Sequence, residues 1–98
     1  MKRIIAKKTL REFWEKHRDC EQYLKTWYQT ANGANWKSPN DIKKMYANAS
    51  IIAHNRVVFN IKGNDYRLVV KFNYHMQWAF IRFIGTHKEY DKIDSTTI

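Results

Sequence analysis

Apolar side chains recur at helical spacing in the first half of the chain. Between residues 10 and 17 they lie three or four positions apart, which predicts an amphipathic helix. This helix is expected to begin at Thr9 and extend to about His17, because Thr9 and Glu12 form the Thr-x-x-Glu pattern of a capping box. The short apolar segment Arg3–Ala6 that precedes it predicts an edge strand.

The same spacing returns between residues 23 and 31 and predicts a second helix. Its expected start is the segment Asp19–Gln22. Its expected end is Asn32–Gly33, since glycine takes the left-handed conformation that closes many helices. Ser38 followed by proline is typical of a helix cap with Pro at the first helical position. We therefore expect a third, short helix over Pro39–Tyr46.

After Ala49 the pattern changes from helical to extended. Three segments rich in Val, Ile, Phe and Tyr follow one another, separated by connections at 62–65 and 74–76 that are short enough for hairpins. They predict three consecutive antiparallel strands, which are Arg56–Ile61, Tyr66–Asn73 and Gln77–Ile84.

The end of the chain returns to a helical pattern after a break at Gly85. Thr86 and Glu89 form a second capping box and predict a last helix that extends to about Ile93, followed by a polar tail. Helices before an antiparallel sheet, with a short one after it, predict an α+β fold in a single domain spanning residues 1–98. The N-terminal helices are expected to pack on one face of the sheet.

The composition of the chain indicates which kinds of binding partner and which cellular compartment to expect. The 98 residues carry a formal net charge of +9, which favours a polyanion as partner: nucleic acid, an anionic membrane or an acidic protein. No apolar run approaches the roughly 20 residues of a membrane-spanning helix, and Met1–Leu10 lacks the pattern of a signal peptide. The single Cys20 excludes an internal disulfide and is typical of the reduced cytoplasm. We therefore expect a cytoplasmic protein with no membrane partner.

The strand Tyr66–Asn73 has one apolar and one polar face. Its even-numbered residues are apolar and are expected to meet the helices, whereas Arg67 and Lys71 share the opposite face. Simple alternation does not say which way Arg82 points on the next strand, but a bulge or an edge position would place it beside these two cations. The solvated side of an antiparallel sheet ordinarily carries polar residues. Three cations together nevertheless favour a phosphate-binding surface.

His87 follows the predicted cap and therefore lies at the positive end of the helix dipole. That field favours a neutral imidazole that can accept a proton, and free backbone N–H groups at the same place can bind a phosphate oxygen. Tyr90 and Asp91 lie near the same face, so Asp91 can orient the ring while Tyr90 donates a proton or stacks on a base. The alternative interpretation is a capped helix with an exposed His–Asp pair.

The acidic residues and histidines do not form a metal-ligand pattern. His87 and Asp91 have the spacing of two ligands, but nothing near them completes a set of three or four. The nine acids are scattered rather than clustered as a Mg²⁺ site requires. We therefore expect no metal and no cofactor. RNA cleavage needs neither, because the 2′-hydroxyl is itself the nucleophile: a base removes its proton, cations stabilise the phosphorane, and an acid protonates the 5′ leaving oxygen.

Several longer segments of the chain resemble the HigB toxins of type II toxin–antitoxin systems. Taken together, the resemblance covers nearly the whole chain. The segments are Arg3–Lys7, Trp36–Pro39, Asn55–Asn64, Tyr66–Val70 and Arg82–Ile93, and the run Thr86–Asp91 is the most specific part.

This resemblance implies a RelE-like fold, in which N-terminal helices pack on a small antiparallel sheet with a short C-terminal helix. It also implies an mRNA endonuclease, or mRNA interferase, that acts with the translating ribosome and inhibits translation. Its expected partners are mRNA, the ribosome and a HigA-type helix-turn-helix antitoxin. Operator DNA is expected to bind only through the complex with that antitoxin.

The resemblance further implies roles for residues that match the family. Arg67 and Arg82 are expected to bind the phosphate or stabilise the transition state, and His87 and Tyr90 to transfer protons. Apart from the resemblance, Lys71, Lys88 and Arg56 are further cations that we expect to contact RNA. Two other interpretations stay open: a non-catalytic RNA-binding module, and a basic subunit that binds only an acidic protein.

Overall fold

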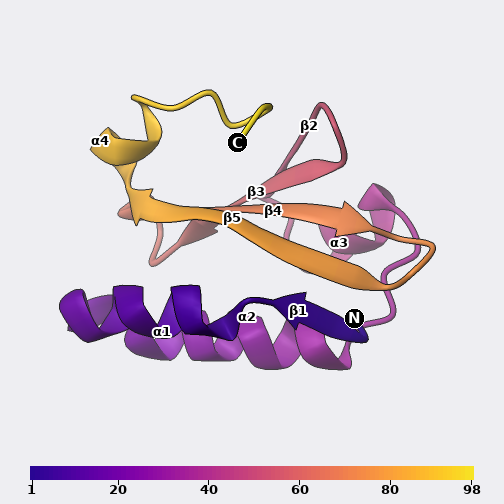
Figure 1. Ribbon diagram of the computed structural model, residues 1–98, viewed down its shortest axis with the longest axis horizontal. Helices are drawn as coiled ribbons and strands as arrows, with labels where there is room; N and C mark the ends of the chain where they lie inside the picture. Colours follow the sequence, from indigo (N-terminus) through magenta and orange to yellow (C-terminus); the bar gives the residue numbers. More distant parts are fainter.

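The computed structural model describes residues 1–98 as five strands, four α-helices and one short 3₁₀ turn (Figure 1). In chain order these elements are β1 (Arg3–Ile5), α1 (Lys7–Lys16), the 3₁₀ turn (Arg18–Cys20), α2 (Glu21–Gly33), α3 (Pro39–Met45), β2 (Ser50–Ile52), β3 (Arg56–Ile61), β4 (Tyr66–Asn73), β5 (Trp78–Thr86) and α4 (His87–Tyr90).

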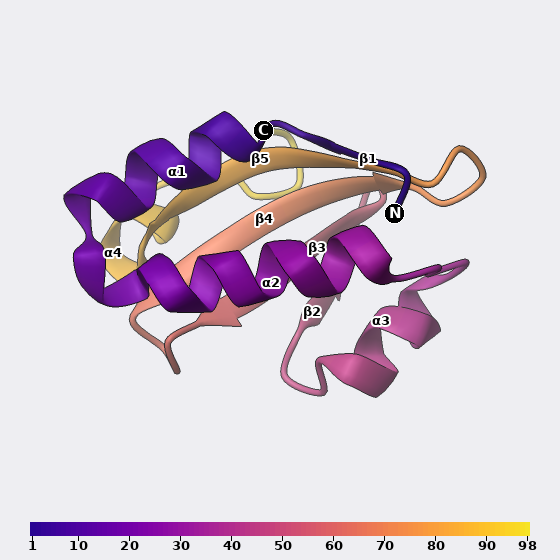
Figure 2. The ribbon, with the colours of Figure 1, turned by 90° about the horizontal axis from the view of Figure 1, so that it is seen from below.

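The strands form one sheet in the order β1-β5-β4-β3-β2. All neighbouring pairs are antiparallel except β1 and β5, which are parallel. The helices α1 and α2 lie across one face, which we call the inner face, while α4 and the C-terminal segment lie over the other, the outer face (Figure 1, Figure 2). None of the helices is both long enough and apolar enough to cross a membrane.

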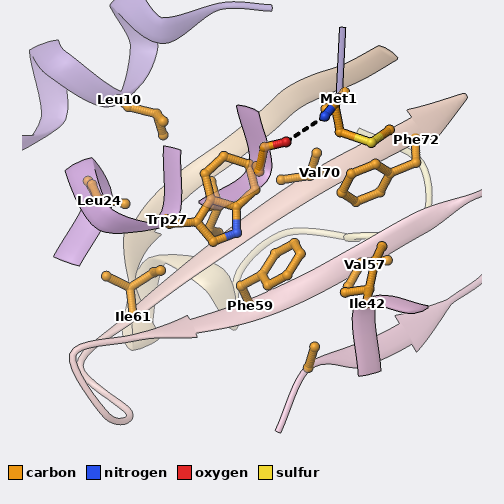
Figure 3. Close-up of a cluster of buried hydrophobic side chains, with 14 of the residues drawn as sticks. Met1, Leu10, Leu24, Trp27, Ile42, Val57, Phe59, Ile61, Val70 and Phe72 are labelled. Atoms are coloured by element: carbon orange, nitrogen blue, oxygen red, sulfur yellow. Dashed lines mark hydrogen bonds between the residues drawn. The ribbon is translucent and has the colours of Figure 1, made fainter. Parts of the chain in front are cut away.

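The inner face and the two long helices enclose one hydrophobic core (Figure 3). Trp27 of α2 meets Phe59 of β3 edge-on, with ring centroids 5.3 Å apart, and Phe59 in turn contacts Phe72 of β4 at 6.3 Å. Leu10 of α1 and Leu24 of α2 are fully buried in the same cluster. Burial of side chains of this size stabilises a fold by about 1.5–3 kcal/mol each, so this core holds the sheet against its helices.

The N-terminal ammonium group of Met1 links the start of the chain to the end of α2. It donates a hydrogen bond to the carbonyl oxygen of Ala31 at 2.6 Å (Figure 3). It also donates to the carbonyl oxygen of Ala34. A positive charge is favourable there, because the last carbonyls of a helix carry partial negative charge. Burial lowers the pKa of this amine.

The α+β architecture predicted from the sequence is confirmed, with corrections at the ends of the elements. The capping box predicted at Thr9 is wrong: because β1 leads directly into the helix, α1 begins at Lys7 and no side chain caps it. The last helix ends at Tyr90 rather than at Ile93, and β2 is an additional short strand that the pattern did not predict.

A hydrogen-bonded cluster at Asp19 fastens the connection between α1 and α2 to the β3–β4 hairpin. The Tyr66 hydroxyl donates to Asp19 Oδ1 at 2.6 Å, and Lys62 Nζ donates to Oδ2 at 2.9 Å. The hydrogen bond from Tyr66, and then that from Lys62, hold the pKa of Asp19 below its usual value. The same Tyr66–Asp19 hydrogen bond raises the pKa of Tyr66 to about 12.

Replacing Asp19 with Asn is expected to remove part of the protein's sensitivity to acid. Because the pKa of Asp19 is lowered in the folded state, the unfolded chain takes up this proton at a higher pH than the folded chain does. The stability that the cluster contributes is therefore present above the unfolded pKa of about 4 and is lost as the pH falls through the folded value. The free energy of unfolding in urea, measured from about pH 6 down to about pH 2.5, should fall less steeply for Asp19→Asn than for the wild type.

Glu12→Gln changes an exposed carboxylate on α1 and is the control for this experiment, with the wild-type slope expected. If the free energy of unfolding of Asp19→Asn falls as steeply toward low pH as that of the wild type, the prediction is contradicted.

Candidate active site

The outer face of the sheet carries the cations predicted from the alternation along β4. Leu68 and Val70 of this strand are fully buried in the core, whereas Arg67 is half-buried and Lys71 is exposed on the opposite face. The prediction that the even-numbered residues of β4 meet the helices is therefore confirmed.

A β-bulge determines where Arg82 lies. The register between β4 and β5 shifts between Val69 and Val70, which pair with residues 83 and 81, so that Arg82 has no partner of its own. Ile81 and Ile84 both pack against the core, although they are three residues apart, and Arg82 is exposed. Bulges redirect the side chains beside them. Arg82 therefore lies level with the middle of β4, between the two cations of that strand.

A contact between Arg67 and Tyr90 links β4 to α4. The guanidinium carbon of Arg67 lies 6.0 Å from the centroid of the Tyr90 ring, at the limit of a cation–π contact. Arg67 Nη1 also donates to the carbonyl oxygen of Asn64 at 3.2 Å. Phe83 also lies near the Tyr90 ring, at a centroid distance of 6.4 Å, and the Tyr90 hydroxyl lies 3.4 Å from Ser95 Oγ. These contacts fix an arginine and a phenol side by side.

His87 is oriented by Asp91, as the spacing predicts. His87 Nδ1 lies 3.1 Å from Asp91 Oδ2, and both side chains are about half exposed. This contact engages one ring nitrogen and leaves Nε2 without a partner in the chain. Nε2 is therefore the nitrogen able to exchange a proton with a bound molecule.

The start of α4 differs from the phosphate-binding terminus expected there. The capping box is confirmed, since Glu89 N donates to Thr86 Oγ1 and Thr86 N donates to Glu89 Oε1 at 2.8 Å. The latter hydrogen bond holds the pKa of Glu89 below its usual value. The backbone N–H of His87, however, donates to Asp65 O at 3.1 Å. The N–H groups of Thr86, His87 and Glu89 are thus already used within the chain, and a helix of one turn has little dipole. This terminus therefore offers a phosphate fewer free N–H groups than the sequence led us to expect.

The remaining predicted RNA contacts divide into two kinds. Lys71 and Lys88 are exposed and form no ion pair with the rest of the chain. Arg56 is only 7% exposed, and its guanidinium donates to the carbonyl oxygens of Ile98 and His54. Arg56 is therefore not free to bind RNA: it anchors the C-terminal segment to the sheet.

Two residues that the sequence interpretation missed shape the site. Phe83 packs on Tyr90, and Gly85 leaves the room that the Phe83 ring occupies, since a Cβ at Gly85 would lie 2.5 Å from Phe83 Cζ. Gly85 therefore does not break the strand, which continues to Thr86. The signal available in the sequence was the pair of apolar residues Phe83 and Ile84, because two adjacent apolar residues do not fit simple alternation.

The site has no ligand set for a metal ion, because no three His, Cys, Asp or Glu side chains gather anywhere in the chain. Its chemistry is that of cations, an imidazole and a phenol on an exposed sheet face. Fold and site together define a small basic α+β domain suited to binding phosphate groups.

The chain belongs to the HigB_toxin family, described as the RelE-like toxic component of a toxin–antitoxin system, whose family model matches residues 20–93. This range contains β3 to α4 and every candidate site residue. The resemblance inferred from the sequence is confirmed.

Named relatives agree with the family. The "mRNA interferase toxin HigB" of Escherichia coli strain K12 is 29% identical over 90 residues, which cover 90% of this chain and 86% of the relative. The "mRNA interferase HigB" of Shigella flexneri matches with the same identity and coverage.

Gly85→Ala is expected to displace the Phe83 ring and loosen Tyr90. Overpacking of this kind costs about 1–3 kcal/mol of stability, and the aromatic NMR contact between Phe83 and Tyr90 should be lost. The double variant Gly85→Ala/Phe83→Ala should be less destabilised than the sum of the two single variants, because the closest clash, that with the Phe83 ring, is then absent. Gly33→Ala is the control, since a Cβ at Gly33 would meet nothing within 4 Å. Additive effects at positions 83 and 85 would refute this account of Gly85.

Proposed function

We propose that this chain is the toxin of a type II toxin–antitoxin pair and that it inhibits translation in the cytoplasm by cutting mRNA. The observation that carries this proposal is the contact of Arg67 with Tyr90 on an exposed face that also holds Arg82. His87, oriented by Asp91, lies on the same helical turn as Tyr90. Membership in the HigB_toxin family supports the proposal, as do the relatives that are named mRNA interferases.

The proposed reaction is a transesterification within the RNA. The 2′-oxygen attacks the adjacent phosphorus as a base takes its proton, so that a 2′-O–P bond forms. The P–O5′ bond then breaks, and an acid protonates the departing 5′ oxygen. The products are a 2′,3′-cyclic phosphate and a 5′-hydroxyl. The nucleophile belongs to the substrate, so the protein supplies only proton transfer and positive charge.

We assign these tasks to the groups of the site. Arg67 and Arg82 bind the phosphate and stabilise the charge that develops on its oxygens, as fixed cations do at such transition states. His87, through Nε2, and Tyr90, through its hydroxyl, are the proton-transfer groups. Lys71 and Lys88 extend the positive surface along which the RNA backbone lies.

The proposed partners follow from the charge and the family. A net charge of +9 favours association with the ribosome and mRNA, both polyanions. The antitoxin would be of the HigA type and would bring the complex to operator DNA through its own helix-turn-helix. A non-catalytic RNA-binding module is the second candidate, and exposed cations beside an aromatic ring are the observation that favours it.

Substitutions in the site should separate cleavage from binding. His87→Ala and Tyr90→Phe are each expected to lower the single-turnover rate of mRNA cleavage on purified translating ribosomes by about 100-fold to 10,000-fold. Arg67→Ala is expected to lower it by about 100-fold to 1,000-fold. Co-sedimentation with ribosomes should change little for His87→Ala and Tyr90→Phe.

Tyr23→Phe on α2 and Arg11→Ala on α1 are exposed, matched controls and should cleave at the wild-type rate. Cleavage that persists in both His87→Ala and Tyr90→Phe would overturn the site assignment. A wild-type protein that binds ribosomes and RNA but never cleaves would favour the binding module.

The ends of the cleaved RNA test the chemistry independently of the site assignment. A 2′-deoxy substitution at the cleaved nucleotide should abolish cutting, and end-specific ligation should detect a 2′,3′-cyclic phosphate and a 5′-hydroxyl. EDTA should leave the cleavage of isolated RNA intact. Products with a 5′-phosphate and a 3′-hydroxyl would instead indicate attack by a metal-activated water, and the proposed mechanism would then be rejected.

A further inference from the structure

A hollow lies on the outer face, at the end of β4 away from α4. Its volume is about 450 Å³, and the side chains that line it include Asn55, Lys71, Asn73, His75 and Phe80. It opens on the same face as Arg67 and Arg82, yet neither of these residues lines it. The mechanism proposed above makes no use of it except for the phosphate contact of Lys71.

The sheet register explains how these side chains come together. Lys71 of β4 is the cross-strand partner of Phe80 of β5, so a cation and an aromatic ring are neighbours on one face. Asn55 precedes β3 in a left-handed conformation with φ of 60°, which Asn tolerates better than most residues. Its carbonyl oxygen accepts a hydrogen bond from Phe72 N at 2.8 Å, which ties this turn to β4.

The polar groups of the hollow are largely unoccupied. Asn73 Oδ1 accepts a hydrogen bond from Met76 N at 3.0 Å, so the amide is held in place while its NH₂ group remains free. The side chains of Asn55, Lys71 and His75 make no hydrogen bond or ion pair within the chain. Donors and acceptors thus converge beside a half-buried ring without satisfying one another.

We propose that this hollow is a binding site for one unpaired base of an RNA strand. The base stacks on Phe80, the amides of Asn55 and Asn73 bind its edge, and Lys71 binds the adjoining phosphate. Proteins recognise single-stranded RNA in this way, through aromatic stacking and hydrogen bonds to base edges. The inference rests on the proposed function for the identity of the ligand as RNA.

The position of the hollow gives it a role distinct from the cleavage site. Lys71 lies four residues from Arg67 along β4, which is about 13 Å at roughly 3.3 Å per residue. A base bound there therefore belongs to a neighbouring nucleotide rather than to the one whose phosphate is attacked. The hollow would select which sequences are cut, or hold a base of ribosomal RNA beside the cleavage site.

Binding of uncleavable RNA tests the hollow directly. The probes are short 2′-O-methyl oligoribonucleotides of each base and an abasic strand of equal charge, measured by fluorescence anisotropy. The wild type should bind at least one base-containing strand about tenfold more tightly than the abasic strand. Asn55→Asp and Phe80→Leu should lose that preference, whereas Lys71→Gln should weaken binding to all strands alike.

Asn40→Asp and Lys44→Gln make the same chemical changes on α3, away from the hollow, and should retain the wild-type preference. Thermal melting close to that of the wild type establishes that Asn55→Asp and Phe80→Leu are folded. Equal affinity of the wild type for abasic and base-containing strands would overturn the proposal. So would an unchanged preference in both Asn55→Asp and Phe80→Leu.

Experiments with ribosomes distinguish the two possible sources of the bound base, mRNA and ribosomal RNA. If the base comes from mRNA, Phe80→Leu should change the sequence preference of cleavage and leave sedimentation with vacant ribosomes unchanged. If it comes from ribosomal RNA, sedimentation should weaken and the sequence preference should remain. Base preference without any cleavage would reject the proposed function and keep the subsite, whereas cleavage without base preference would reject the subsite alone.

Discussion

The bulge in β5 is the constraint on which the arrangement of the outer face depends. If β5 continued in register from the pair of Ile84 with Leu68, residue 82 would lie opposite Val70 and point into the core. An arginine buried there without a partner would cost several kcal/mol. One extra residue turns Arg82 out to solvent and keeps Ile81 in the core. The bulge thereby gives the sheet an apolar inner face and a cationic outer face.

The outer face consists of a buried apolar part and an exposed cationic part. Val58 and Val69 lie on this side by register, yet they are buried, and the C-terminal segment passes over this face (Figure 1). Arg56 holds the end of that segment through Ile98, which explains why this arginine is buried while Lys71, its partner across the strands, is exposed. The segment passes over this face, where Lys71 and Arg82 remain exposed.

Such a surface suits chemistry in which the substrate brings its own nucleophile. A protein that cleaves RNA through the 2′-hydroxyl needs a few fixed charges and two groups that move protons, and needs neither a deep cavity nor a cluster of carboxylates. A domain of 98 residues has little buried volume beyond its core. An open site on a sheet face, as proposed for RNA cleavage, is consistent with that size.

The sequence by itself determined what depends on neighbours along the chain. Its alternation identified the inner face of β4, and its spacing identified the capping box at Thr86 and the His87–Asp91 pair, because each requires only local geometry. The direction of Arg82, the anchoring of Arg56 and the contact of Arg67 with Tyr90 were decided by the tertiary structure alone. Each of these depends on strand register or on the path of the C-terminal segment. Both are set by packing between distant residues, and a pattern read along the chain contains no information on such contacts.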